Sequence, residues 1–311
     1  MDHYNFFSTR KRELLVLQAQ ILQMRRWGGG KRPAAMHHFM AFDGCLYSRL
    51  DPGLSGNPHQ SNVANLYDQA CAAQAHTPGF YADYFAGLGT LEAASHLITE
   101  GNAQPHGGRS IAMVAYRRLA ERVASQNNRA ALAHGGGVSV SVVALGRGQA
   151  SALAFVQLLA ERGIVSADGR QCAPPGVPVC GVVFLAPLAT PLDAAVVLPA
   201  NMSGPVLVVQ SKRAPLMPFV VRDYADDPRV FAIEMGLHHV AVVGGCDLRG
   251  PGAAVLAGAT GYLQRCGIPL GDVPLHRQFI AAQVAGHCLT RLGPDAAANL
   301  YGGGVPANAR S

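Results

Sequence analysis

The segment that most constrains the fold is an apolar run, a Gly-x-Gly turn and a helical pattern over residues 138–163. It opens with VSVSVVAL, whose β-branched apolar side chains favour a buried strand. Gly146-Arg147-Gly148 follows, and the remaining residues carry apolar side chains at helical spacing. A strand, a sharp turn and a helix form a nucleophile elbow, in which the central residue of small-x-Ser-x-Gly presents an attacking hydroxyl. The central residue here is Gly146, which has no side chain.

The same alternation of strands and helices runs along the chain. Strand-like apolar runs recur at residues 36–42, 180–186, 204–210, 229–235 and 239–244. Helical spacing recurs at residues 63–75, 110–125 and 252–266. Continuous apolar strands with intervening helices are typical of parallel sheets that are covered on both faces. We therefore predict an α/β fold with a doubly wound, mostly parallel sheet.

Composition and charge indicate one domain with a basic N-terminal extension. The 311 residues are 49% hydrophobic and 14% charged, which suits one large core. We assign residues 34–300 to this domain and 301–311 to a flexible tail. Residues 1–33 contain seven basic and two acidic residues, and an amphipathic helical pattern from 9 to 27 ends at three glycines. Such a helix packs on its own domain with its charges in solvent, or docks on a partner or an anionic membrane.

Several classes of protein are disfavoured. No apolar run reaches the roughly 20 residues that span a bilayer, and no secretory signal pattern opens the chain, so we expect a cytoplasmic protein. The seven cysteines are dispersed without Cys-x-x-Cys pairs, which favours reduced thiols and no metal site. No basic stripe with interleaved aromatic residues indicates nucleic-acid binding. Ser151 stands where a dinucleotide-binding turn needs its third glycine, so we expect no cofactor.

Five separated segments resemble one family in the same order. They are FDGC at 42–45, SNVANLY at 61–67, YFAGLGT at 84–90, ALGRGQ at 144–149 and GIPL at 267–270. Together they resemble the α/β-hydrolase domain of type VI secretion phospholipase effectors. The resemblance implies a sheet of the α/β-hydrolase type, with an attacking serine, a histidine that takes its proton and an aspartate that orients the histidine.

The chain departs from this family at all three triad positions. The serine position is Gly146, the aspartate position after the next strand is Ala189, and the histidine position in a glycine-rich element is Gly245. Glycine suits an elbow that no longer needs a hydroxyl, because it adopts the strained backbone without a side-chain penalty. The resemblance also implies a vestigial pocket, lined by Asp43, Gly44, Cys45, Arg147, Gly148, Cys246 and Asp247.

The expected function is therefore that of a pseudoenzyme, a binding or accessory protein. The resemblance implies three partners for its basic helix: a type VI secretion component, a cognate effector or a lipid surface. The alternative is an active lipid esterase with a displaced nucleophile, for which Cys45 and Cys246 are the candidates. A third hypothesis is a domain kept only for stability within a larger assembly. Ser139 and Ser141 are expected to be structural, one on each face of the sheet.

Overall fold

A computed structural model describes most of the chain. The described residues are 15–26, 33–94, 108–125, 137–189, 197–211, 220–221, 224, 227–237, 239–245 and 249–278. The expected tail at 301–311, and Cys246 and Asp247 of the expected pocket, lie outside these residues.

The centre of the molecule is a six-stranded sheet in which every strand pairs in parallel, as predicted. Its strand order is β10-β8-β6-β3-β1-β2. The strands are β1 (Met36–Phe42), β2 (Phe80–Phe85), β3 (Val138–Leu145), β6 (Val179–Leu185), β8 (Val206–Ser211) and β10 (Val230–Met235). Two small antiparallel pairs lie outside this sheet: β4 (Ile164–Val165) with β5 (Gln171–Ala173), and β7 (Leu188–Ala189) with β9 (Val220–Val221).

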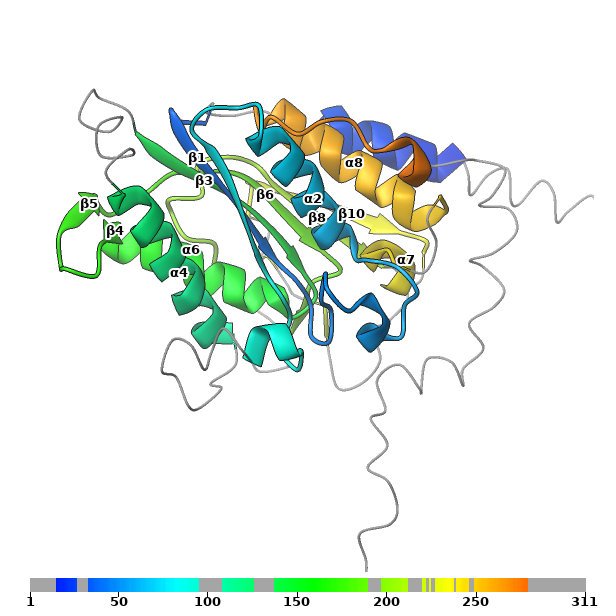
Figure 1. Cartoon of the computed structure of the whole chain (residues 1–311). Coiled ribbons are helices and arrows are strands. Elements are labelled where there is room, and N and C mark those ends of the chain that lie inside the picture. Colours follow the sequence, from blue (N-terminus) through cyan, green and yellow to red (C-terminus); the bar gives the residue numbers. More distant parts are fainter. Residues whose placement is uncertain are drawn as a thin grey trace, which may run out of the picture.

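Helices cover both faces of the sheet, which makes the fold a doubly wound α/β fold (Figure 1). One face packs against α4 (Gly108–Ala124) and α6 (Gly148–Arg162). The other packs against α2 (Asn62–Gln74), α7 (His239–Val243), α8 (Pro251–Arg265) and a helix of residues 15–26. Short 3₁₀ turns are formed by η1 (Pro52–Ser55) and η3 (Leu275–Arg277).

Alternation along the strands divides the core into two layers. In β1, Phe39 and Ala41 belong to the layer under α2 and α8, whereas Met40 and Phe42 belong to the layer under α4 and α6. Successive side chains of a strand point to opposite faces, so a strand buried on both sides is apolar throughout. The continuous apolar runs of the sequence have this origin.

The expectation of one serine on each face of β3 is wrong. Ser139 and Ser141 contact the same buried ring, because His37 Nδ1 lies 2.7 Å from Ser139 Oγ and Nε2 lies 3.0 Å from Ser141 Oγ. Residues two apart in a strand share a face. Both hydroxyls are buried, and they pair β3 with β1.

Two further expectations differ from the structure. Residues 239–244 were predicted as a strand, but His239–Val243 form the short helix α7. The strand β2 at Phe80–Phe85 was not predicted, because Asp83 and two tyrosines interrupt its apolar pattern. The Asp83 carboxylate is balanced by an ion pair with Arg122 of α4 at 2.8 Å.

The N-terminal helix packs on the domain. Residues 15–26 are helical, and Leu17, Ile21 and Met24 are buried in the layer with α8. Gln20 Nε2 donates to the carbonyl oxygen of Glu234 at 2.8 Å, so this helix also covers the edge strand β10. No helix among the described residues is long and apolar enough to cross a membrane.

Candidate functional site

The candidate site lies where the chain reverses its direction of winding. The strand β1 has β2 on one side and β3 on the other, so the loops after β1 and β3 diverge at the carboxyl edge of the sheet. In open α/β sheets, ligands bind in the crevice at such a topological switch point. The sequence-predicted residues Asp43, Gly44 and Cys45 follow β1, and Gly146, Arg147 and Gly148 follow β3.

The turn between β3 and α6 is sharp and follows the predicted strand–turn–helix order, and we call it the elbow. Gly146 has a φ of +50°, and a Cβ added to it would find its nearest atoms at 3.9 Å, the Ala186 carbonyl oxygen, and at 4.0 Å, Leu188 Cδ1. A serine side chain would therefore fit in the space above this turn. At Gly148, an added Cβ would collide with the Asp43 carbonyl oxygen and lie 2.8 Å from that of Phe42. Residue 148 must be glycine because the backbone of the loop after β1 approaches it closely, whereas glycine at 146 is favoured only by the positive φ.

Asp43 holds the loop after β1 with a buried carboxylate. Its Oδ1 accepts a hydrogen bond from Gly44 N at 2.9 Å, and its Oδ2 accepts from Ser61 Oγ and Tyr84 Oη, both at 2.7 Å. Ser61 is also the N-cap of α2, where its Oγ accepts from Ala64 N at 3.0 Å. Burial raises the pKa of Asp43 to about 6, and the three hydrogen bonds oppose this rise.

The thiol of Cys45 lies beside Arg147, so the two loops of the switch point meet. Burial raises the pKa of Cys45, while the charge of Arg147 and a hydrogen bond with its guanidinium act in the opposite direction. Arg147 is exposed and Cys45 is half-buried. A thiol with a raised pKa carries little thiolate at neutral pH, so this environment does not activate it as a nucleophile.

Ala189, at the expected aspartate position, lies in the short strand β7 opposite Val220. This strand crosses above the elbow, because Leu188 N donates to the Gly146 carbonyl oxygen at 3.4 Å. It follows Ala186, a residue with a φ of +44°. A non-glycine residue in this region of φ is strained, and such residues concentrate at functional sites.

Gly245, at the expected histidine position, is closed in by backbone. Its φ is +90°, and an added Cβ would lie 2.7 Å from the His59 carbonyl oxygen and 3.2 Å from Asn57 Cβ. Its own carbonyl oxygen accepts from His59 N at 3.0 Å. A histidine at 245 has no room without moving the loop that precedes α2. Asn57 connects this loop to the switch point, because its Nδ2 donates to Tyr47 Oη at 2.9 Å.

Sequence reasoning missed the polar partners that support the site. Tyr84 and Ser61 lay inside segments used for the family resemblance, but the pattern gave no sign that both hydroxyls meet Asp43. Asn62 likewise donates through Nδ2 to the carbonyl oxygens of Val242 at 3.2 Å and Gly252 at 3.0 Å. These contacts bridge 18 to 190 positions of the chain, which local patterns do not encode.

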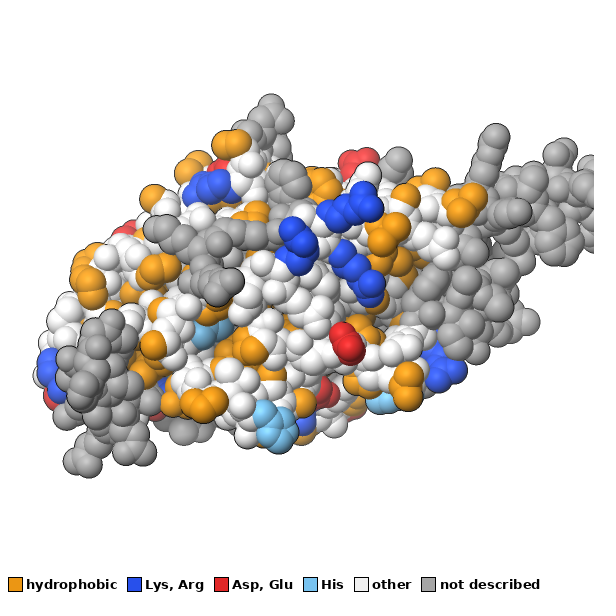
Figure 2. Space-filling view, turned by 90° about the horizontal axis from the view of Figure 1, so that it is seen from above, with side chains coloured by type: hydrophobic (Ala, Val, Ile, Leu, Met, Phe, Trp, Pro, Cys, Tyr) orange, Lys and Arg blue, Asp and Glu red, His pale blue; other side chains and the backbone are white. Residues whose placement is uncertain are grey.

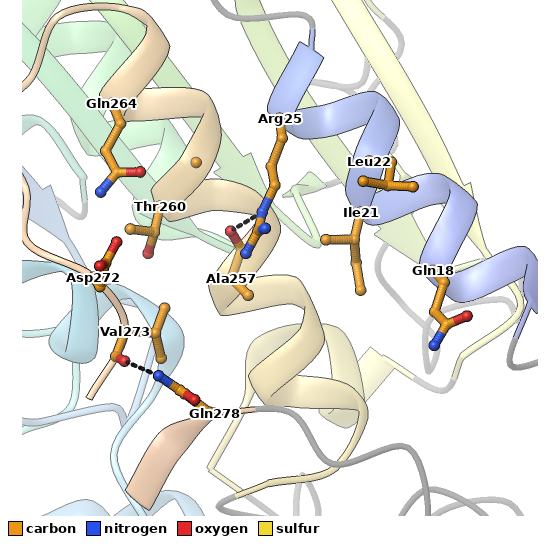
Figure 3. Close-up of a pocket in the computed structure, with 11 residues that line it drawn as sticks. Gln18, Ile21, Leu22, Arg25, Ala257, Thr260, Gln264, Asp272, Val273 and Gln278 are labelled. Atoms are coloured by element: carbon orange, nitrogen blue, oxygen red, sulfur yellow. Dashed lines mark hydrogen bonds between the residues drawn. The ribbon is translucent and has the colours of Figure 1, made fainter. Parts of the chain in front are cut away.

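A separate cavity of about 560 Å³ lies outside the switch point (Figure 3). Its floor is α8, with Ala257, Thr260, Gly261 and Gln264, and one wall is the helix of residues 15–26. The segment from 272 to 278 forms the opposite wall. None of the residues that line it belongs to the expected pocket. Across the described part of the chain, no group of three or more His, Cys, Asp and Glu side chains is placed to hold a metal ion.

Comparisons with known proteins give the fold but no activity. No family model and no curated protein matches the chain. Among solved structures, it is similar to the crystal structure of an uncharacterized protein from Pseudomonas aeruginosa, with 16% identity and a TM-score of 0.50. The similarity covers 94% of this chain and 53% of that protein, so the chain spans about half of its length. Similarity at this identity supports the doubly wound α/β class alone.

Proposed function

We propose that this chain is a pseudoenzyme: a non-catalytic relative of α/β-hydrolase phospholipases that acts as a binding or accessory protein. The observation that carries the proposal is the turn at Gly146. Its φ of +50° and the open space above it suit a nucleophile elbow, yet the residue has no side chain. The main-chain geometry of a hydrolase is thus combined with the loss of its attacking group.

The surroundings of the other two triad positions support the same proposal. Gly245 has no room for a histidine, since an added Cβ would lie 2.7 Å from the His59 carbonyl oxygen. Ala189 supplies no carboxylate to orient a base. A serine placed at 146 would therefore lack both partners, and a triad without its base retains only the weak catalysis of binding and oxyanion stabilisation.

The test is ester hydrolysis by the purified chain beside its Gly146→Ser variant. Short-chain p-nitrophenyl esters and phospholipid vesicles are the substrates. Gly176→Ser is the matched control, because Gly176 also has a positive φ, of +87°, and nothing within 4 Å of an added Cβ. We expect no turnover by any of the three proteins. Turnover by the parent chain would contradict the proposal, and turnover by Gly146→Ser alone would show that an acid and a base survive elsewhere.

A displaced cysteine nucleophile is the second candidate because of where Cys45 lies, although the raised pKa of its thiol counts against it. Cys45 lies at the same switch point, beside the guanidinium of Arg147. In that case the chain would be a weak lipid esterase with a thiol in place of the hydroxyl. Cys45→Ser would then abolish turnover, whereas Cys71→Ser, a change at another half-buried thiol on α2, would not.

A further inference from the structure

The helix of residues 15–26 carries large apolar side chains on two opposite faces. Leu17, Ile21 and Met24 form the inner face and are 4%, 8% and 0% exposed against α8 and the sheet. Leu15 and Leu22 lie seven positions apart, so they share the other face, and they are 56% and 51% exposed. Leu22 also borders the cavity beside α8. An ordinary surface helix has only one apolar face.

The outer face is a continuous stripe. Leu15, Ala19, Leu22 and Arg26 follow one another at spacings of four, three and four residues, and all four are exposed. Val16 flanks this stripe and is 55% exposed. We call these five residues the outer stripe. Exposed leucine and valine side chains gathered on one helix mark an interaction surface more strongly than scattered ones do.

Cationic side chains accompany the outer stripe. Arg26 is exposed at the end of the helix, and Arg265 is exposed at the end of α8. Arg25 is also exposed, although its Nε donates to the Ala257 carbonyl oxygen of α8 at 3.4 Å. The space-filling view from above shows Lys and Arg side chains gathered next to hydrophobic ones on this side of the molecule (Figure 2). In the sequence, Arg10-Lys11-Arg12 precede the helix.

We propose that the outer stripe docks on an anionic lipid bilayer, with the helix lying along the membrane surface. The leucine and valine side chains would enter the boundary between headgroups and acyl chains, and the arginines would face the lipid phosphates. This lipid partner deepens the proposed non-catalytic function and rests on it, because the bilayer is what such a binding protein would bind.

A second copy of the chain fits the outer stripe less well than an anionic bilayer does. Parallel packing of two such helices would place Arg25 and Arg26 against the same residues of the other copy. Antiparallel packing would offer them no carboxylate either, because residues 15–26 contain no Asp or Glu. Neither arrangement offsets the charges of the arginines, whereas anionic headgroups do.

The chain supplies its own reporter for the test. Trp27 directly follows Arg26 and is the single tryptophan of the sequence. The full-length protein is titrated with vesicles of phosphatidylcholine containing about 30% phosphatidylglycerol, and with pure phosphatidylcholine vesicles. We expect a blue shift of tryptophan emission and co-sedimentation with the anionic vesicles only. Both signals should weaken severalfold in high salt, because salt screens the arginine–phosphate attraction.

Matched variants separate the outer stripe from general effects. Leu15→Ser/Leu22→Ser should weaken binding at least about tenfold, because burial of even one leucine side chain is worth that much. The control is Leu91→Ser/Val197→Ser, which removes two side chains that are 89% and 95% exposed on other parts of the surface. Arg26→Glu should weaken binding about fivefold or more, and Arg170→Glu, an exposed arginine between β4 and β5, should not.

Three outcomes would overturn the inference: no binding to anionic vesicles, equal binding to both vesicle types, or equal loss in the stripe and control pairs. A change in oligomeric state on Leu15→Ser/Leu22→Ser without vesicle binding would assign the stripe to a second copy instead. Ester hydrolysis is a separate readout. Ester turnover together with vesicle binding would contradict only the proposal that the chain is a pseudoenzyme. Absence of both turnover and vesicle binding would contradict only the proposal that its partner is a lipid bilayer.

Discussion

Asp43 shows how a single buried carboxyl group links the site to pH. Its pKa in the folded protein, about 6, lies above the ordinary value of 3.8. The folded state therefore favours the protonated form, and the stability that this contributes is present below about pH 4 and lost as the pH rises through about 6. A pKa difference of this size between the unfolded and folded protein corresponds to about 3 kcal/mol.

Asp43→Asn tests this linkage, because asparagine has no charge to bury. Relative to the parent, the variant should gain about 3 kcal/mol of unfolding free energy between pH 4 and pH 7. Urea unfolding at each pH measures the difference between the two proteins, which cancels the other titrating groups. Parallel pH profiles would show that Asp43 titrates normally.

For the adjacent histidines of β1, we predict the opposite dependence of stability on pH. Burial lowers the pKa of both His37 and His38 to about 3, and the charge of Arg122 contributes for His38. Their stability contribution is therefore present above about pH 6.5 and lost as the pH falls towards 3. His37 pairs with Ser139 and Ser141, whereas neither ring nitrogen of His38 has a hydrogen-bond partner.

Substitution by leucine should separate the two residues. His37→Leu removes the ring contact of two buried hydroxyls, of which Ser139 keeps its hydrogen bond from Ala34 N, whereas His38→Leu removes two unsatisfied nitrogens. We expect His37→Leu to be less stable than His38→Leu by about 2 kcal/mol at pH 7. Each variant should also lose less stability than the parent between pH 6.5 and pH 4.5. Equal stability at pH 7 would mean that the hydrogen bonds of His37 contribute nothing.

At the scale of the element, the β3–turn–α6 unit is where sequence and structure agree most closely. The expected bounds, 138–145 and 148–162, are those of β3 and α6. The apolar pattern changes at Gly146 from a β-branched run to helical spacing, so the end of the strand and the start of the helix are visible in the sequence. Both elements are also long enough for their local pattern to identify them. The run at 239–244 was too short to separate strand from helix, and it formed α7.

Two glycines of the elbow should respond differently to a side chain. Gly148→Ala places a methyl group against the carbonyl oxygens of Asp43 and Phe42, so we expect a loss of about 3 kcal/mol or more. Gly146→Ala meets open space and only the strain of a φ of +50°, which costs about 1–2 kcal/mol. Thermal unfolding of both variants measures the difference. A more damaging change at 146 than at 148 would contradict the elbow geometry.

At the scale of the whole molecule, most contacts of the candidate site depend on the order of the strands in the sheet and not on a local sequence motif. Asp43, Cys45 and Arg147 were predicted as neighbours, and the parallel order of β1 and β3 brings their loops together. The contact of Gly245 with His59 and the cavity beside α8 were not predicted. Both join segments that are distant in sequence, and their positions follow from packing of the complete fold rather than from local periodicity.

The N-terminal helix shows the same dependence, because its sequence pattern left open which leucines face inward. The structure buries Met24 completely, and an added Cβ at Gly258 of α8 would lie 2.5 Å from its sulfur. Met24→Ala should therefore cost about 2–4 kcal/mol through lost packing and the cavity left behind. Leu22→Ala, two positions earlier and 51% exposed, should change stability by no more than about 0.5 kcal/mol.

Alanine suits a helix at both positions, so the comparison isolates packing against α8 from helix formation. Chemical unfolding of the two variants provides the measurement, and equal losses would place Leu22 in the core instead. The expected inequality has a further consequence for the outer stripe. Its leucines contribute little to the free energy of unfolding because they stay exposed to water in the folded protein. Burial of these side chains in a bilayer would therefore provide a favourable hydrophobic free energy of binding that folding does not provide.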